Sequence, residues 1–131
     1  MKYFKFFFVF AAVLMSSCMS ENDENACYSI TATPTTAVTG PTETTVGVPI
    51  TLNVTYTVFN NCDSFYLFFE EITQSAKYYA VNVRYDGCNC PSQNYSRTQP
   101  FEFVSQEVGS FALRFKTTNT TYVEHVVEVT E

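Results

Sequence analysis

Cysteine is the residue type in this chain that is best equipped to carry chemistry. Five cysteines occur, Cys18, Cys27, Cys62, Cys88 and Cys90, alongside a single histidine, His125. Cys88 and Cys90 are one residue apart, and two thiolates with an imidazole are ligands that Cu(I) and Zn²⁺ accept. A metal site on Cys88, Cys90 and His125 is therefore one interpretation of this pattern. The other interpretation is disulfide bonding.

Cys18 directly follows a segment that is typical of an export signal. Lys2 and Lys5 precede an apolar run, 6–15, which at ten residues is too short to span a bilayer. The stretch LMSSC, residues 14–18, resembles the lipobox of bacterial lipoproteins. This resemblance implies that the signal peptide 1–17 is removed and that Cys18 becomes a lipidated N-terminus. The first partner of the protein is then a membrane, reached through the lipid anchor.

The residues after Cys18 are polar and acidic. Glu21, Asp23 and Glu24 fall within the segment 18–26. This segment is similar to the export signals of surface-exposed lipoproteins of the Bacteroidetes, which implies a place on the outer membrane, facing the cell surface. The alternative is a solvated tether that faces the periplasm. In either case we expect one domain, residues 27–131, to follow the tether.

The charge of the chain argues against one class of partner. From Cys18 onward there are five basic residues against thirteen acidic ones, a net charge of −8. A nucleic-acid-binding domain carries a basic patch or stripe, and the sequence shows none. We therefore expect no nucleic-acid partner.

Alternation of apolar and polar residues predicts a protein made of β-strands. In VPITLNVTYTV, residues 48–58, every second residue is apolar and most of the others are polar, which is the pattern of a half-buried strand. The same reasoning predicts strands at 64–72, 76–85, 97–104, 110–117 and 121–130. It also predicts a first strand, or a broken pair of strands, at 28–38, where Pro34 interrupts the run.

About seven short strands separated by turn residues favour an all-β fold of two sheets. The stretches TTVGVPITLNVTYTV (44–58) and VGSFALRF (108–115) are similar to segments of bacterial immunoglobulin-like domains. The resemblance implies an immunoglobulin-like antiparallel β-sandwich, preceded by the lipoprotein signal peptide.

The expected strands also restrict the disulfide pattern. Cys62 precedes the strand 64–72, whereas Cys88 and Cys90 follow the antiparallel strand 76–85, so all three belong at one end of the sandwich. Cys27 opens the first strand at the same end. A bond between Cys88 and Cys90 would close a strained ring across one residue. We therefore expect Cys62 to pair with either Cys88 or Cys90, and Cys27 with the other.

Candidate catalytic groups are poorly arranged in the sequence. Glu70 and Glu71 are neighbours in a strand and point to opposite faces, so they cannot serve one site as acid and base. His125 shares the strand parity of Val123 and Val127, which is typical of a histidine at the margin of a core. We expect no catalytic residues and no cofactor.

Aromatic residues supply the remaining candidate site. Strict alternation along 64–72 separates Phe65 and Phe69 from Tyr66 and Phe68. One of these faces must pack into the core, and Tyr66 and Phe68 on the other face are the candidate binding surface. The sequence thus favours a non-catalytic binding module on the envelope, with a protein or glycan ligand. The alternatives are a metal-handling lipoprotein that uses Cys88, Cys90 and His125, and a purely structural envelope protein.

Overall fold

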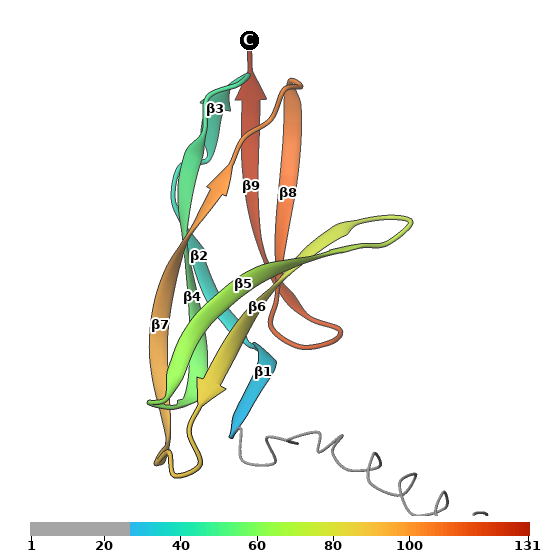
Figure 1. Cartoon of the computed structure of the whole chain (residues 1–131). Helices are drawn as coiled ribbons and strands as arrows, with labels where there is room; N and C mark the ends of the chain where they lie inside the picture. The colour runs from blue at the N-terminus through green and yellow to red at the C-terminus, as the bar shows by residue number, and fades with distance from the viewer. Residues whose placement is uncertain (1–26) are drawn as a thin grey trace, which may run out of the picture.

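The computed structural model describes residues 27–131 as an all-β protein of nine strands (Figure 1). The predicted signal peptide 1–17 and the lipidated tether 18–26 lie outside the described residues. The strands are β1 (Tyr28–Thr33), β2 (Thr35–Thr39), β3 (Glu43–Thr45), β4 (Ile50–Asn60), β5 (Asp63–Ile72), β6 (Lys77–Asp86), β7 (Ser92–Phe103), β8 (Gly109–Lys116) and β9 (Tyr122–Thr130).

Two sheets form a sandwich-like arrangement. The smaller sheet has the order β2-β4-β7, and the larger has the order β1-β6-β8-β9-β3 with β5 on the other side of β6. Most pairs are antiparallel, but β3 runs parallel to β9 and β6 runs parallel to β8. The expected antiparallel pairing therefore holds for five of the seven strand pairs, and these two pairs depart from it. The expected number of strands, about seven, was too small. The run 28–38 forms two strands, and the three-residue β3 is too short to show alternation.

The break at Pro34 is where the chain changes sheets. β1 pairs with β6 in the larger sheet, whereas β2 pairs with β4 in the smaller one. Thr33 and Thr35, on either side of the proline, are both buried. The Pro34 carbonyl accepts a hydrogen bond from the Thr57 amide at 3.1 Å. Proline has no N–H to donate to a ladder, so it suits this crossing point between two ladders. Of the two alternatives predicted at 28–38, a first strand or a broken pair of strands, the structure shows the broken pair.

The core lies between the two sheets and follows the predicted alternation. In β4, every second residue from Leu52 to Val58 is at most 2% exposed. Val81 and Val83 of β6, Phe115 of β8 and Val127 of β9 face them and are fully buried. Burial of each such side chain stabilises the fold by about 1.5–3 kcal/mol. The period-two pattern therefore predicted both the strands and the side of each that faces the core.

Strand β5 does not follow strict alternation, because it contains a bulge. Phe65 pairs with Val83 and Leu67 pairs with Asn82, so Tyr66 is an extra residue without a partner on β6. A bulge shifts the alternation of the residues after it. Phe65 and Phe68 consequently share the inner face, with their ring centroids 5.0 Å apart. The prediction that Tyr66 and Phe68 share one face was wrong for this reason.

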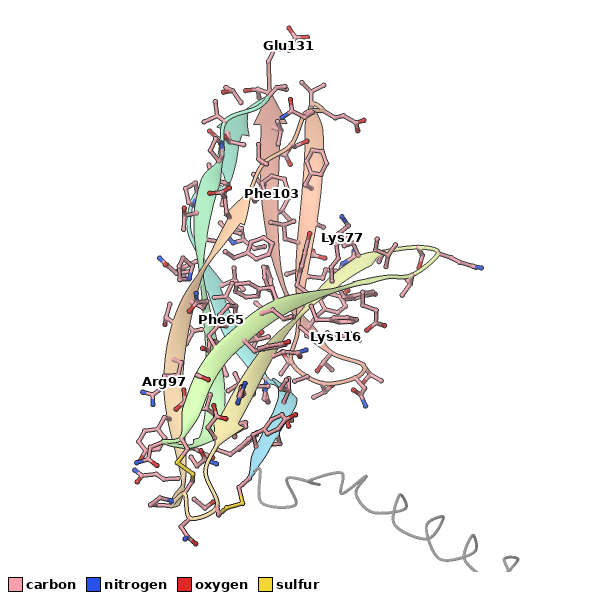
Figure 2. The ribbon with its side chains drawn as sticks, in the orientation of Figure 1. Phe65, Lys77, Arg97, Phe103, Lys116 and Glu131 are labelled. Carbon is pink, nitrogen blue, oxygen red and sulfur yellow. A yellow bond between two sulfur atoms is a disulfide. The ribbon has the colours of Figure 1, made fainter. Side chains whose placement is uncertain are left out.

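The four cysteines of the domain gather at one end of the sandwich, the end where β1 begins (Figure 2). Cys27 is bonded to Cys88, and Cys62 is bonded to Cys90. Disulfide bonding at this end is as expected, and the structure selects between the two pairings that the sequence left open. Backbone hydrogen bonds hold the cysteines close together, because the Asp86 amide donates to the Cys62 carbonyl and the Gly87 amide donates to the Cys27 carbonyl.

Candidate functional site: an aromatic groove between β7 and β8

The larger sheet opens at a fork between β6 and β8. β8 pairs with β9 along its whole length, but it pairs with β6 only at Arg114 and Phe115. Beyond this contact the β5–β6 hairpin turns away from β8 and projects from the body of the protein (Figure 1). The first part of β8, residues 109–113, therefore has a neighbouring strand on one side only within the described part of the chain.

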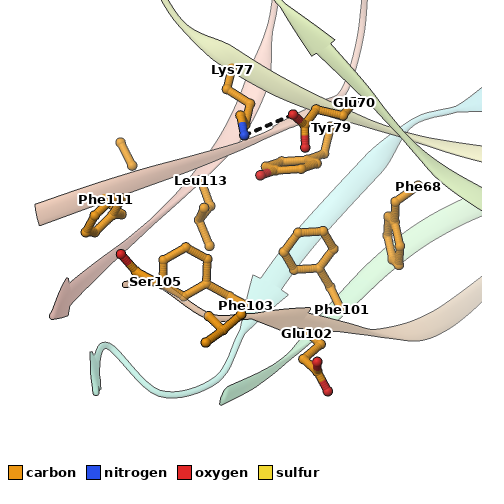
Figure 3. Close-up of a pocket in the computed structure, with 12 residues that line it drawn as sticks. Phe68, Glu70, Lys77, Tyr79, Phe101, Glu102, Phe103, Ser105, Phe111 and Leu113 are labelled. Atoms are coloured by element: carbon orange, nitrogen blue, oxygen red, sulfur yellow. Dashed lines mark ion pairs between the residues drawn. The ribbon is translucent and has the colours of Figure 1, made fainter. Parts of the chain in front are cut away.

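A groove of about 640 Å³ occupies this fork (Figure 3). Its lining comes from both sheets: Phe68 and Glu70 of β5, Lys77 and Tyr79 of β6, Phe101, Glu102 and Phe103 of β7 with Val104 and Ser105 after it, and Phe111, Ala112 and Leu113 of β8. The lining residues of β7 and β8 are consecutive in the chain. Because consecutive residues of a strand point to opposite faces, the groove must expose the backbone edges of both strands.

Aromatic rings form the floor of the groove. Phe101 lies at its centre, with its ring centroid 4.8 Å from that of Tyr79 and 5.1 Å from that of Phe68. Phe103 and Phe111 form a second pair, with centroids 5.7 Å apart. Tyr79 and Phe103 are buried, whereas the other three rings are only partly buried. The floor thus continues the core outward and presents ring surface to solvent.

An ion pair stands at the hairpin side of the groove. Lys77 Nζ lies 2.9 Å from Glu70 Oε1, and both side chains are nearly half exposed (Figure 3). The hydrogen bond to Glu70 raises the pKa of the Lys77 amine above its usual value. Burial raises the pKa of the neighbouring Tyr79 phenol. Near neutral pH this side of the groove therefore presents an ammonium–carboxylate pair and a neutral hydroxyl.

The structure distributes the predicted site residues unevenly. Phe68 lines the groove, whereas Tyr66, half exposed at the bulge, does not. Phe101, Phe103 and Phe111 were missed as groove residues, because alternation places them on the inner face like ordinary core residues. The signal that was available is the consecutive PFEFVS run of 100–105, which is more apolar than an exposed strand end requires.

The alternative metal ligands are not brought together. Both Cys88 and Cys90 are used in disulfides. The His125 ring lies on β9, where Nε2 is 3.0 Å from the Pro41 carbonyl oxygen. Within residues 27–131, no cluster of three His, Cys, Asp or Glu side chains is placed to hold a metal ion.

The most strongly engaged carboxylate lies outside the groove, near the cysteine end. The Asp63 side chain is only 6% exposed, and Arg97 donates to both of its oxygens at 2.8 and 3.0 Å. The hydrogen bonds from Arg97 lower the pKa of Asp63 below its usual value, although burial opposes this effect. Because β5 and β7 belong to different sheets, this pair ties the two sheets together. Its two oxygens are occupied by structural bonds.

Two further observations complete the description of the domain. Residues 27–131 contain no helix with the length and hydrophobicity that a membrane crossing requires. No protein-family model, no curated protein and no solved structure matches this chain.

Proposed function

We propose that this protein is a lipid-anchored, non-catalytic binding module of the bacterial envelope, and that its ligand occupies the aromatic groove between β7 and β8. The ligand is a protein or glycan of the envelope or of its surroundings. Anchoring is through Cys18, on the outer membrane and facing the cell surface.

The observation that carries the proposal is the opening of the core at the fork. Partly exposed rings of Phe68, Phe101 and Phe111 line one concave site, where Phe68 packs against Phe101 and Phe111 packs against Phe103. Contiguous apolar surface and aromatic-lined clefts with a few polar groups are typical of binding sites. A sandwich with a purely structural role would gain stability by closing β6 onto the whole of β8.

The position of the groove suits display from a membrane. The chain enters the domain at the cysteine end, where the two disulfides hold β1 and the ends of β5, β6 and β7 together. From Cys18 the eight residues 19–26 can reach at most about 28 Å. The groove lies away from this end and is therefore accessible to partners beyond the membrane surface.

The immunoglobulin-like character of the fold is also part of the proposal. It is supported by the facing arrangement of β2-β4-β7 and β8-β9-β3. The parallel pairing of β6 with β8 departs from the antiparallel sheets of such domains. This departure is what opens the fork, so we propose that the variation serves the site.

The anchor is tested by fractionating cells that express the wild type or Cys18→Ser. We expect the wild type in the membrane fraction and Cys18→Ser either unprocessed or released. A processed Cys18→Ser protein that withstands high-salt washing of the membranes would contradict the lipid anchor.

The groove is tested by placing a photoreactive phenylalanine analogue at Phe111 in the native cells. Phe59 is the matched control, because it is 44% exposed on β4 and does not line the groove. We expect cross-linked adducts from position 111 and few from position 59. Equal labelling at both positions, or labelling at position 59 alone, would contradict the proposed site.

A further inference from the structure

The free part of the β8 edge is the starting point for a narrower inference about the ligand. Within residues 27–131, no strand lies beside residues 109–113 on the side of the groove, and three of these residues in sequence, Phe111 to Leu113, line it. Backbone N–H and C=O groups on such an edge can accept another strand. The groove therefore offers two things at once, an unpaired ladder and an apolar floor beside it.

Most of the other strand edges of the domain are poorly suited to strand addition, and the stretch of β9 that β3 leaves unpaired carries the charged Glu124. β5 is interrupted by the bulge at Tyr66, and β7 carries Pro100, which cannot donate a hydrogen bond. β1 ends at Pro34, β2 is short and bulged, and β3 has three residues. In contrast, residues 109–113 of β8 contain no proline and no charge, and their register with β9 is regular. Natural proteins usually block such an edge, and this one is left open.

The charges of the domain indicate the chemistry of the partner. Within residues 27–131, each of the five cations is in an ion pair. Among the described residues, the carboxylates that remain outside these pairs are Glu43, Glu102, Glu107, Glu128 and Glu131. Glu102 lines the groove, and Glu107 lies in the connection that leads from Ser105 of the groove to β8. The groove and its approach are therefore negatively charged, and each cation that the structure describes is already in an ion pair.

We propose that the ligand of the groove is an extended peptide segment of a partner protein, which adds to the free edge of β8 as a strand. One alternate set of its side chains is apolar and lies on Phe101 and Phe103, and the segment also carries basic residues, which the uncompensated charges of Glu102 and Glu107 at the margin of the groove attract. The inference rests on the proposed function and narrows it to one class of ligand. Main-chain hydrogen bonds supply affinity in this mode, and the alternate side chains supply specificity.

The length of the free edge sets the size of the segment. Five residues of strand span about 17 Å at roughly 3.3 Å per residue. The segment must lie alongside β8 between the Arg114 contact with β6 and Gly109 at the start of the strand. A peptide of about seven alternating lysine and valine residues is therefore a suitable probe.

The decisive experiment compares this peptide with two N-methylated forms, each methylated on one alternate set of amides. In an added strand only one set of amides faces β8, so one form should lose at least tenfold in affinity while the other binds like the parent. Binding is measured by fluorescence anisotropy with the purified domain, and amide exchange should slow at residues 109–113.

Protein variants locate the binding. Phe111→Ala should weaken peptide binding at least tenfold, whereas Phe59→Ala should leave it unchanged. Glu102→Gln should weaken it about two- to fivefold at low salt, as for a screened attraction between exposed charges, and Glu128→Gln is the control on the outer face of β9. An alternating glutamate and valine peptide should bind more weakly than the lysine form.

The outcomes separate the two proposals. If both methylated peptides bind with equal affinity and Phe111→Ala still weakens their binding, the groove is a ligand site but the proposal of strand addition is wrong. If the lysine–valine peptide does not bind while photolabelling in cells still marks position 111, the peptide class is overturned and the groove stands. If neither is observed, both proposals fail.

Discussion

The two disulfides should contribute unequally to stability, and in the opposite order to their loop lengths. Cys62 and Cys90 are 28 residues apart, and Cys27 and Cys88 are 61 apart. In the chain-entropy model these loops correspond to about 3.6 and about 4.3 kcal/mol of unfolding free energy. Loop length alone therefore predicts that the Cys27–Cys88 bridge contributes about 0.7 kcal/mol more.

The structure reverses this order. Cys62–Cys90 joins the connections that flank β4, β5, β6 and β7, which pack around the core. Cys27–Cys88 holds only the start of β1, a strand whose first five residues are exposed. Without that bridge β1 can fray while the rest of the domain stays folded. The added conformational entropy of β1 then stabilises the folded state and offsets part of the entropy that the unfolded chain gains. We expect Cys62→Ala/Cys90→Ala to cost about 3.6 kcal/mol and Cys27→Ala/Cys88→Ala to cost clearly less.

Urea denaturation of the two double variants measures these costs, and amide exchange reports on β1. Exchange at residues 28–32 should accelerate in Cys27→Ala/Cys88→Ala and stay slow in Cys62→Ala/Cys90→Ala. A larger loss of stability in Cys27→Ala/Cys88→Ala, with β1 still protected, would refute the reasoning.

Three further predictions concern the cysteine end and the core. Gly87→Ala should lower the urea midpoint and leave free thiols, because a Cβ at this position (φ +137°) would lie 2.9 Å from Cys90 Sγ. The control is Gly47→Ala, which is also at positive φ but has space around it and should form both disulfides normally. Asp63→Asn should lower stability near neutral pH but not in acid. The depressed pKa of Asp63 stabilises the fold above about pH 3.8, and this contribution is lost as the pH falls through the folded-state pKa. An unchanged difference in unfolding free energy between wild type and variant at low pH would contradict this. Phe115→Ala should cost about 3–5 kcal/mol in urea denaturation because Phe115 is fully buried, whereas Phe59→Ala should cost under about 1 kcal/mol, and similar costs would be evidence against the assigned core.

Much of the fold could be predicted from the sequence because alternation has a direct physical cause. A half-buried strand must place every second side chain inside, and β4 shows this from Ile50 to Val58. The break at Pro34 was readable for the same kind of reason, because proline lacks the N–H that a ladder needs. The position of the cysteines at one end followed from counting strand directions.

The groove could not be predicted in the same way. The bulge at Tyr66 leaves no composition signal, yet it changes which aromatic residues of β5 face inward. The parallel contact of β6 with β8 is a long-range pairing of two residues on each strand, which no local pattern encodes. Phe101 and Phe111 look like core residues in the sequence, and only the fork makes their rings accessible.

Hydroxyl-radical footprinting on intact cells, compared with the purified domain, tests the central claim most directly. Radicals oxidise exposed aromatic side chains, so a ligand in the groove protects the rings that it covers. We predict reduced oxidation on cells at Phe68, Phe101 and Phe111, and equal oxidation in both samples at Phe59 and Tyr28, which are exposed elsewhere. Unchanged oxidation of the groove rings on cells, or protection of Phe59 in their place, would contradict the assignment of the groove as the binding site.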